Sequence, residues 1–245
     1  MKLDPYLSSI RSDVDRMART AREGDLKAPV DACPGWDLRE LIAHTGAVHR
    51  WATTAIVGGE APAAVEYAFP PPAAPGAELG TWLLDGAGTL IASLEARQPE
   101  DPTWHPFGLE QQVWVWARRQ AQETMIHRWD AEVAAFGASS LEPAAAVEGI
   151  AEFFDLALPR VFVRESVAVP ASSLHVHCTD RDGEWIAWND DGEYRLAAEH
   201  RKGDAAVRGS AADLLLVLMG RADPSCIDIV GDPRAADAWL GLPGL

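Results

Sequence analysis

The longest helical pattern in the chain spans residues 110–136, with the sequence EQQVWVWARRQAQETMIHRWDAEVAAF. At spacings of three or four, one stripe of this segment carries Val113, Trp116, Gln120, Glu123, His127 and Asp130. Residues one helical turn apart share a face, so the Glu123 carboxylate and the His127 imidazole converge on one point. Such a pair can supply two ligands to one divalent cation. Alone, it also fits an ordinary hydrogen bond on a helix surface.

A second predicted helix, over residues 37–57, offers a third ligand. It starts at Asp37 with Glu40 three residues later, which is an aspartate version of the capping box. His44 shares an apolar stripe of this helix with Leu41, Val48 and Trp51. An unpaired imidazole there is costly, so His44 needs a metal or a carboxylate as its partner. A hydrogen-bonded core histidine is the alternative interpretation.

His49 is the other candidate for the third ligand. It lies five residues after His44, roughly 140° around the helix, so the two side chains do not easily face one site. Three protein ligands leave room for water or substrate, which is typical of a catalytic metal site. Neutral imidazole and carboxylate suit Zn²⁺, and also Fe²⁺, Ni²⁺ or Mn²⁺.

The rest of the chain changes from a helical to a mixed pattern. Further helices are predicted at residues 7–24 and 79–97, separated from their neighbours by proline-containing loops at 61–76 and 99–106. After a boundary near 138–145, alternating patterns predict strands at 173–179, 184–188, 193–198, 205–208 and 226–230, and helices at 211–219 and 233–240. The sequence therefore predicts a helical bundle, residues 1–140, followed by a small α+β domain, residues 141–245.

Composition excludes several classes of protein. The 245 residues are 48% hydrophobic and 24% charged, typical of a globular protein with a core. The net charge of −16, without a basic run, argues against nucleic acid as a partner. No apolar stretch is long enough for a membrane span, and the start of the chain lacks the apolar segment of a secretory signal, so we expect a cytoplasmic protein. Cys33, Cys178 and Cys226 are widely spaced and suggest neither a thiolate zinc site nor a redox pair.

Two motifs resemble those of a known family. Residues 33–44, CPGWDLRELIAH, resemble the P-G-W…L-x-x-H signature of the mycothiol-dependent maleylpyruvate isomerases, within the wider DinB-like metalloenzymes. Residues 118–130, RRQAQETMIHRWD, resemble their second metal motif. Similar segments follow later in the chain, at residues 180–185, 208–216, 220–221 and 230–232.

The resemblance implies a DinB-like four-helix bundle with a metal triad and a C-terminal domain similar to sterol-carrier folds. By motif position, the triad is His44, Glu123 and His127. Gln122 stands where many relatives carry another histidine. The implied cofactors are a divalent metal, with Zn²⁺ as the expected ion, and mycothiol as a thiol cosubstrate.

The resemblance also implies a reaction on a small electrophile. A thiolate adds to a cis double bond conjugated to carbonyls, the resulting single bond rotates, and the thiol leaves to give the trans isomer. A thiol transferase would use the same attack without the expulsion. The alternatives are a thiol-independent metal hydrolase or lyase, and a non-enzymatic protein that binds metal or a small ligand.

An acidic substrate needs a cationic partner, and Arg221 is the candidate for a catalytic carboxylate clamp. Its planar guanidinium suits bidentate pairing, although an arginine at a helix C-terminus is also favoured by the helix dipole. Arg208 is a weaker candidate for the same role. An apolar pocket, or simply the bundle core, would be made by the tryptophans at 36, 51, 82, 104, 114, 116 and 129.

Overall fold

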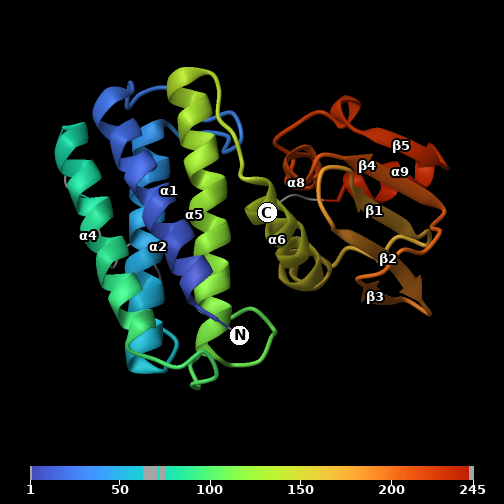
Figure 1. The fold of residues 1–245 in the computed structure, drawn as a ribbon, viewed down its shortest axis with the longest axis horizontal. Helices are drawn as coiled ribbons and strands as arrows, with labels where there is room; N and C mark the ends of the chain where they lie inside the picture. The colour runs from blue at the N-terminus through green and yellow to red at the C-terminus, as the bar shows by residue number, and fades with distance from the viewer. Residues whose placement is uncertain (1, 63–70, 72–74, 243–245) are drawn as a thin grey trace. The chain divides into compact units, whose positions relative to one another are not determined.

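The structure is a computed structural model that describes residues 2–62, 71 and 75–242 (Figure 1). The chain divides into two compact units, Met1–Ser140 and Leu141–Leu245. Most of the loop predicted at residues 61–76 lies outside the described residues.

The first unit is the predicted four-helix bundle. Its helices are α1 (Asp4–Glu23), α2 (Leu38–Gly58), α4 (Gly76–Glu95) and α5 (Val113–Phe136). Both α1 and α2 pack against α4 and α5, so the four helices enclose one core (Figure 1). Apolar residues of α1 at helical spacing are buried there: Leu7, Ile10, Val14, Met17 and Ala21.

Local signals fix the ends of α2, the helix that carries His44. The capping box predicted at Asp37 is confirmed: its Oδ1 accepts a hydrogen bond from the Glu40 amide, and Glu40 Oε2 accepts one from the Asp37 amide, each at 2.9 Å. Gly59 ends the helix at φ 72°, where a side chain would be strained. In between, Gly46 lets the Trp82 ring lie against the helix backbone, because an added Cβ would come within 2.2 Å of Trp82 Cζ3.

The second unit contains a mixed five-stranded sheet with the order β3-β2-β1-β4-β5. The strands are β1 (Leu174–Cys178), β2 (Glu184–Asp190), β3 (Glu193–Ala197), β4 (Ala205–Gly209) and β5 (Asp228–Gly231). β1 is parallel to β4, and the other neighbours are antiparallel. Together with the helices α8 (Ala211–Leu218) and α9 (Pro233–Leu240), this confirms the predicted α+β class.

Two segments of this unit differ from expectation. Residues 143–164 are helical but were not predicted so: α6 (Pro143–Glu152) passes through a π-helical turn (Phe153–Ala157) into α7 (Leu158–Arg164). Cys226 is not in a strand, because Pro224 starts a 3₁₀ turn that ends at Cys226 and the strand begins only at Asp228.

Within the described ranges, no helix combines the length and the apolar character that crossing a bilayer requires.

Candidate metal centre

The three residues predicted as metal ligands meet in the first unit. Glu123 Oε1 lies 3.1 Å from His127 Nε2 and 3.4 Å from His44 Nε2. The two imidazole rings stand edge to face, with their centroids 5.4 Å apart. Ligand atoms at about 2.1 Å around one tetrahedral ion lie about 3.4 Å from each other, so the three donors fit a shared cation.

Two helices bring these side chains together. Glu123 and His127 lie one turn apart on α5, and His44 reaches them from α2, which packs against α5. The three side chains are 11–28% exposed, so the group lies near the surface of the bundle.

His49, the other candidate for the third ligand, is placed differently. It is fully buried, and its Nε2 lies 2.9 Å from the hydroxyl of Thr124. Burial lowers the pKa of His49 to about 3, so the ring is neutral at ordinary pH. Among the described residues, the group that includes Glu123 and His127 takes His44 and not His49.

Charge is concentrated around Glu123. Burial opposes ionisation of this carboxyl, but His127 and Arg119 hold its pKa well below the ordinary glutamate range. Burial likewise opposes protonation of His127, yet Glu123 and a hydrogen bond to Asp130 raise its pKa to about 9. The same negative charge that favours a proton on His127 would favour a cation at this place.

The structure adds two polar residues to this site. Asp130 Oδ2 lies 3.1 Å from His127 Nδ1, and the Arg119 guanidinium pairs with Glu123 Oε2. A carboxylate behind a ligating histidine fixes its orientation, which is the usual outer partner in metal sites. Asp130 was visible on the helical stripe, but its role depends on the rotamer of His127.

The turn before α2 supplies two more neighbours. The Trp36 ring lies 4.9 Å from the His44 ring, centroid to centroid. Cys33 Sγ lies within 4.8 Å of ligand atoms of His127 and Asp130. Spacing along the chain gave no signal for this contact, because it depends on how the turn folds back over α5.

Three of the other tryptophans of the bundle pack on one another. Trp51 contacts Trp116 and Trp104 edge to face, with centroids 5.1 and 6.0 Å apart, and Trp116 is fully buried. These rings therefore form bundle core, in agreement with the simpler of the two predictions.

The two candidate arginines belong to the second unit. Arg221 follows α8 and donates a hydrogen bond from Nη1 to the carbonyl of Met219 at 2.7 Å. This contact satisfies one carbonyl at the end of the helix. Arg208 lies on β4 and is exposed. The role of Arg221 in binding a carboxylate stays a prediction.

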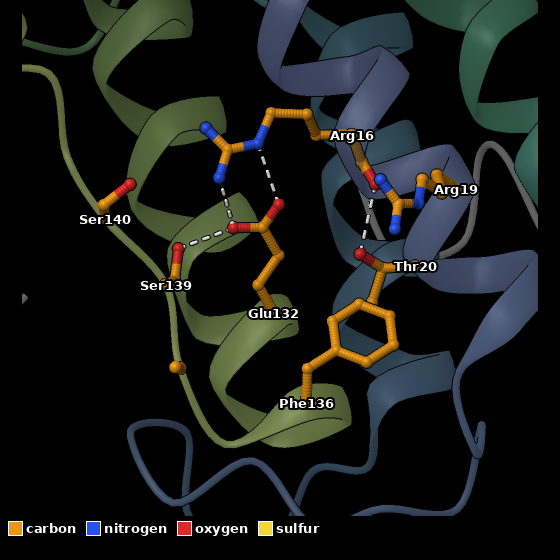
Figure 2. Close-up of a pocket in the computed structure, with 8 residues that line it drawn as sticks. Arg16, Arg19, Thr20, Glu132, Phe136, Ser139 and Ser140 are labelled. Carbon is orange, nitrogen blue, oxygen red and sulfur yellow. Dashed lines mark hydrogen bonds and ion pairs between the residues drawn. The ribbon is translucent and has the colours of Figure 1, made fainter.

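A pocket elsewhere in the bundle has a different character (Figure 2). Figure 2 shows Arg16 of α1 reaching Glu132 of α5, with two hydrogen bonds at 2.8 and 2.6 Å. Glu132 also accepts hydrogen bonds from Ser139 and from the buried Arg128. Asp13 of α1 accepts a hydrogen bond from Arg128, so two guanidinium groups face two carboxylates and the network ties α1 to α5.

Comparison with known proteins agrees with this architecture. The model of the mycothiol maleylpyruvate isomerase N-terminal domain matches residues 7–132, and that of the MDMPI C-terminal domain matches residues 144–238. A crystal structure of the mycothiol-dependent maleylpyruvate isomerase is 16% identical, with a TM-score of 0.63, and that of a histidine-to-alanine mutant is 14% identical, also at 0.63. Both alignments cover 96% of this chain and 96% of the other.

The structural similarity at this identity shows the shared fold. A search of curated protein sequences found no significant match. The first family model alone spans more than half of the chain, and the second covers most of the remainder. The protein therefore belongs to the mycothiol maleylpyruvate isomerase family.

Proposed function

We propose that this protein is a metal- and mycothiol-dependent isomerase or thiol transferase that acts on a small, carboxylate-bearing electrophile. The observation that carries the proposal is the convergence of His44, Glu123 and His127 on one point at the edge of the bundle. Family membership supports mycothiol as the thiol, because the related crystal structures are of a mycothiol-dependent maleylpyruvate isomerase.

His44, Glu123 and His127 would hold the metal, with Zn²⁺ as the proposed ion. Two imidazoles and one carboxylate match the ligand set of a catalytic zinc site with an open position. A divalent cation there would favour the thiolate form of a bound thiol at neutral pH.

The surrounding residues orient the side chains of this site and flank it. Asp130 holds His127 by its Nδ1, which leaves Nε2 directed at Glu123. Arg119 pairs with the other carboxylate oxygen of Glu123 and so keeps this side chain from turning away. Trp36 beside His44 gives the site an apolar wall.

The proposed reaction needs no reagent besides the thiol. The thiolate sulfur forms a bond to one alkene carbon, and the π electrons move onto the conjugated carbonyl. Rotation about the new single bond follows. When the electrons return, the alkene re-forms as the trans isomer and the C–S bond breaks, which regenerates the thiolate. Arg221 is the proposed partner of a substrate carboxylate, because guanidinium pairs with carboxylate in a bidentate geometry.

Two measurements test the proposal. Metal content should fall by one equivalent in His127→Ala and stay unchanged in Glu132→Gln, a control on the same helix. Unchanged occupancy in His127→Ala would refute the ligand assignment. Turnover of maleylpyruvate by the metal-loaded protein should require added mycothiol. Thiol-independent turnover would favour a hydrolase or lyase, and metal binding without turnover of any activated electrophile would favour a binding protein.

A further inference from the structure

A second cluster of potential metal ligands lies on the sheet of the C-terminal unit. It consists of His175 and His177 on β1, Glu184 on β2, and His200 three residues after the end of β3. One potential ligand atom from each of the four residues lies within 4.8 Å of the others.

The sheet itself brings these residues together. His175 and His177 are two residues apart on one strand, so their side chains leave the same face. His177 pairs directly with Glu184 in the antiparallel register of β1 and β2. Side chains directly opposite each other in such a pair are neighbours. The chain after β3 then returns His200 to the same place.

Glu184 is the centre of the cluster. Its Oε1 contacts His177 Nδ1, and its Oε2 lies 2.9 Å from His200 Nδ1 and 3.9 Å from His175 Nε2. The spacing of ligand atoms around one tetrahedral ion, about 3.4 Å, lies between the last two distances. A small adjustment of side chains would therefore let one cation replace the contacts among them.

His175 gives an independent sign of a missing ligand. Its side chain is 7% exposed, and its buried Nε2 makes no hydrogen bond within the part of the chain that the structure describes. A buried nitrogen without a partner is costly.

Solvent can reach the cluster from one side. His200 is 77% exposed, and the loop after β1 forms, with the segment after β3, a pocket of about 700 Å³ lined by His177, Glu184 and His200. A cation would therefore have a path of entry.

We propose that His175, His177, Glu184 and His200 form a second divalent-metal site, separate from the triad. Three imidazole nitrogens and one carboxylate suit zinc-class cations such as Zn²⁺, Co²⁺ and Ni²⁺ rather than Mg²⁺ or Ca²⁺. Four protein ligands fill a tetrahedral shell, as in structural sites. The ion would fasten the segment after β3 to β1 and β2 and leave no position for a substrate.

The test uses the full chain without a polyhistidine tag. The triad is disabled by the double variant His44→Ala/His127→Ala, which is called the triad-free chain below. Titration of this chain with Co²⁺ should show one bound equivalent, with the intense visible absorption of a four-coordinate ion. Adding His200→Ala should weaken Co²⁺ binding by at least tenfold, and adding His177→Ala as well should abolish it. Glu199→Gln, an exposed neighbour of His200, is the matched control and should bind Co²⁺ as before.

His175 is left unchanged in these variants, because it is buried and its loss can disturb the core. Folding of the other variants is checked separately. The exposed position of His200 makes His200→Ala the informative variant, and its far-ultraviolet circular dichroism should match that of its parent. Zn²⁺ should raise the Tm of the triad-free chain but not of the chain that also lacks His177 and His200. Failure of the triad-free chain to bind Co²⁺, or equal binding after both histidines are removed, would overturn the proposal.

Discussion

The helical triad and the sheet cluster each bring histidine and glutamate side chains to one point, but they do so on different backbones. In the bundle, candidate ligands one turn apart on α5 meet a histidine from α2, whereas in the sheet, candidate ligands two residues apart on β1 meet a glutamate from β2. The triad offers three candidate ligands, with Asp130 bonded to His127 and Arg119 paired with Glu123, while the cluster offers four, with Glu184 at its centre.

This difference separates two kinds of metal chemistry. Three protein ligands would leave a coordination position for a thiol or substrate, and the charged residues behind them would hold the ligands in place. Four ligands close the shell, so the sheet cluster would contribute stability and not turnover. We therefore propose that reactivity belongs to the bundle, and the following predictions test this proposal.

The largest effect is expected at Glu123. Glu123→Gln removes the negative charge that both imidazoles share, and kcat/KM should fall by about 1,000-fold, as for loss of a principal catalytic group. Steady-state kinetics at saturating mycothiol measure the fall in kcat/KM.

Glu132→Gln on the same helix is the control for that experiment. It weakens the ion pairs with Arg16 and Arg128, so the free energy of unfolding should fall by about 1–3 kcal/mol. Its kcat/KM should stay within about twofold of the parent, as expected for a residue outside the site. Equal losses of activity in the two variants would mean that Glu123 acts only through the fold.

The convergence of the triad could largely be predicted from the sequence, because it depends on local features of two helices. The spacing of Glu123 and His127 is fixed by the helix, and the capping box fixes where α2 begins. Helical spacing alone does not decide between His44 and His49, since the choice depends on the rotation of α2 against α5; the family motif is what points to His44. That rotation is set by packing, as at Gly46 and Trp82.

In the second unit, local sequence features do not suffice to predict the cluster or all of the helices. His175 and His177 stand out as polar residues in an alternating strand, but Glu184 joins them only through the register of β1 and β2. The helical stretch at 143–164 was missed because Pro159 interrupts its pattern. The structure accommodates Pro159 in the first turn of α7, after the π-helical turn.

A second prediction concerns the layer behind the triad. Asp130→Asn keeps the shape but removes the charge behind His127, so metal affinity should fall by about 10- to 100-fold. Competition with a chelator measures the affinity. Affinity equal to that of the parent would remove the main distinction between the two clusters.

Arg221 tests whether the second unit takes part in catalysis. Arg221→Met should raise KM for a dicarboxylate substrate, lowering kcat/KM by about tenfold, because a charged hydrogen bond is lost. Turnover of the corresponding neutral ester should not change. A loss of stability with unchanged KM would mean that Arg221 only caps α8 through Met219.

The smallest effect is a pH dependence of stability from His49. Its pKa is about 3 in the folded chain and about 6.5 when unfolded, so below pH 6.5 the unfolded chain takes up a proton that the folded chain does not. Stability is therefore lost as pH falls from 6.5 toward 3, by about 1.4 kcal/mol at pH 5.5. Urea unfolding with chelator should show that the metal-free parent loses this much more than His49→Gln between pH 7 and 5.5.

The contact between Gly46 and Trp82 makes the bundle site adjustable. Gly46 lies two residues from His44, so Trp82 presses on α2 from the side roughly opposite the imidazole. The position of α2, and with it that of His44, therefore depends in part on a ring that is not among the proposed ligands. A change of ion preference can therefore be sought by substituting Trp82. A smaller or larger ring there would change the distances among the donor atoms without removing any of them.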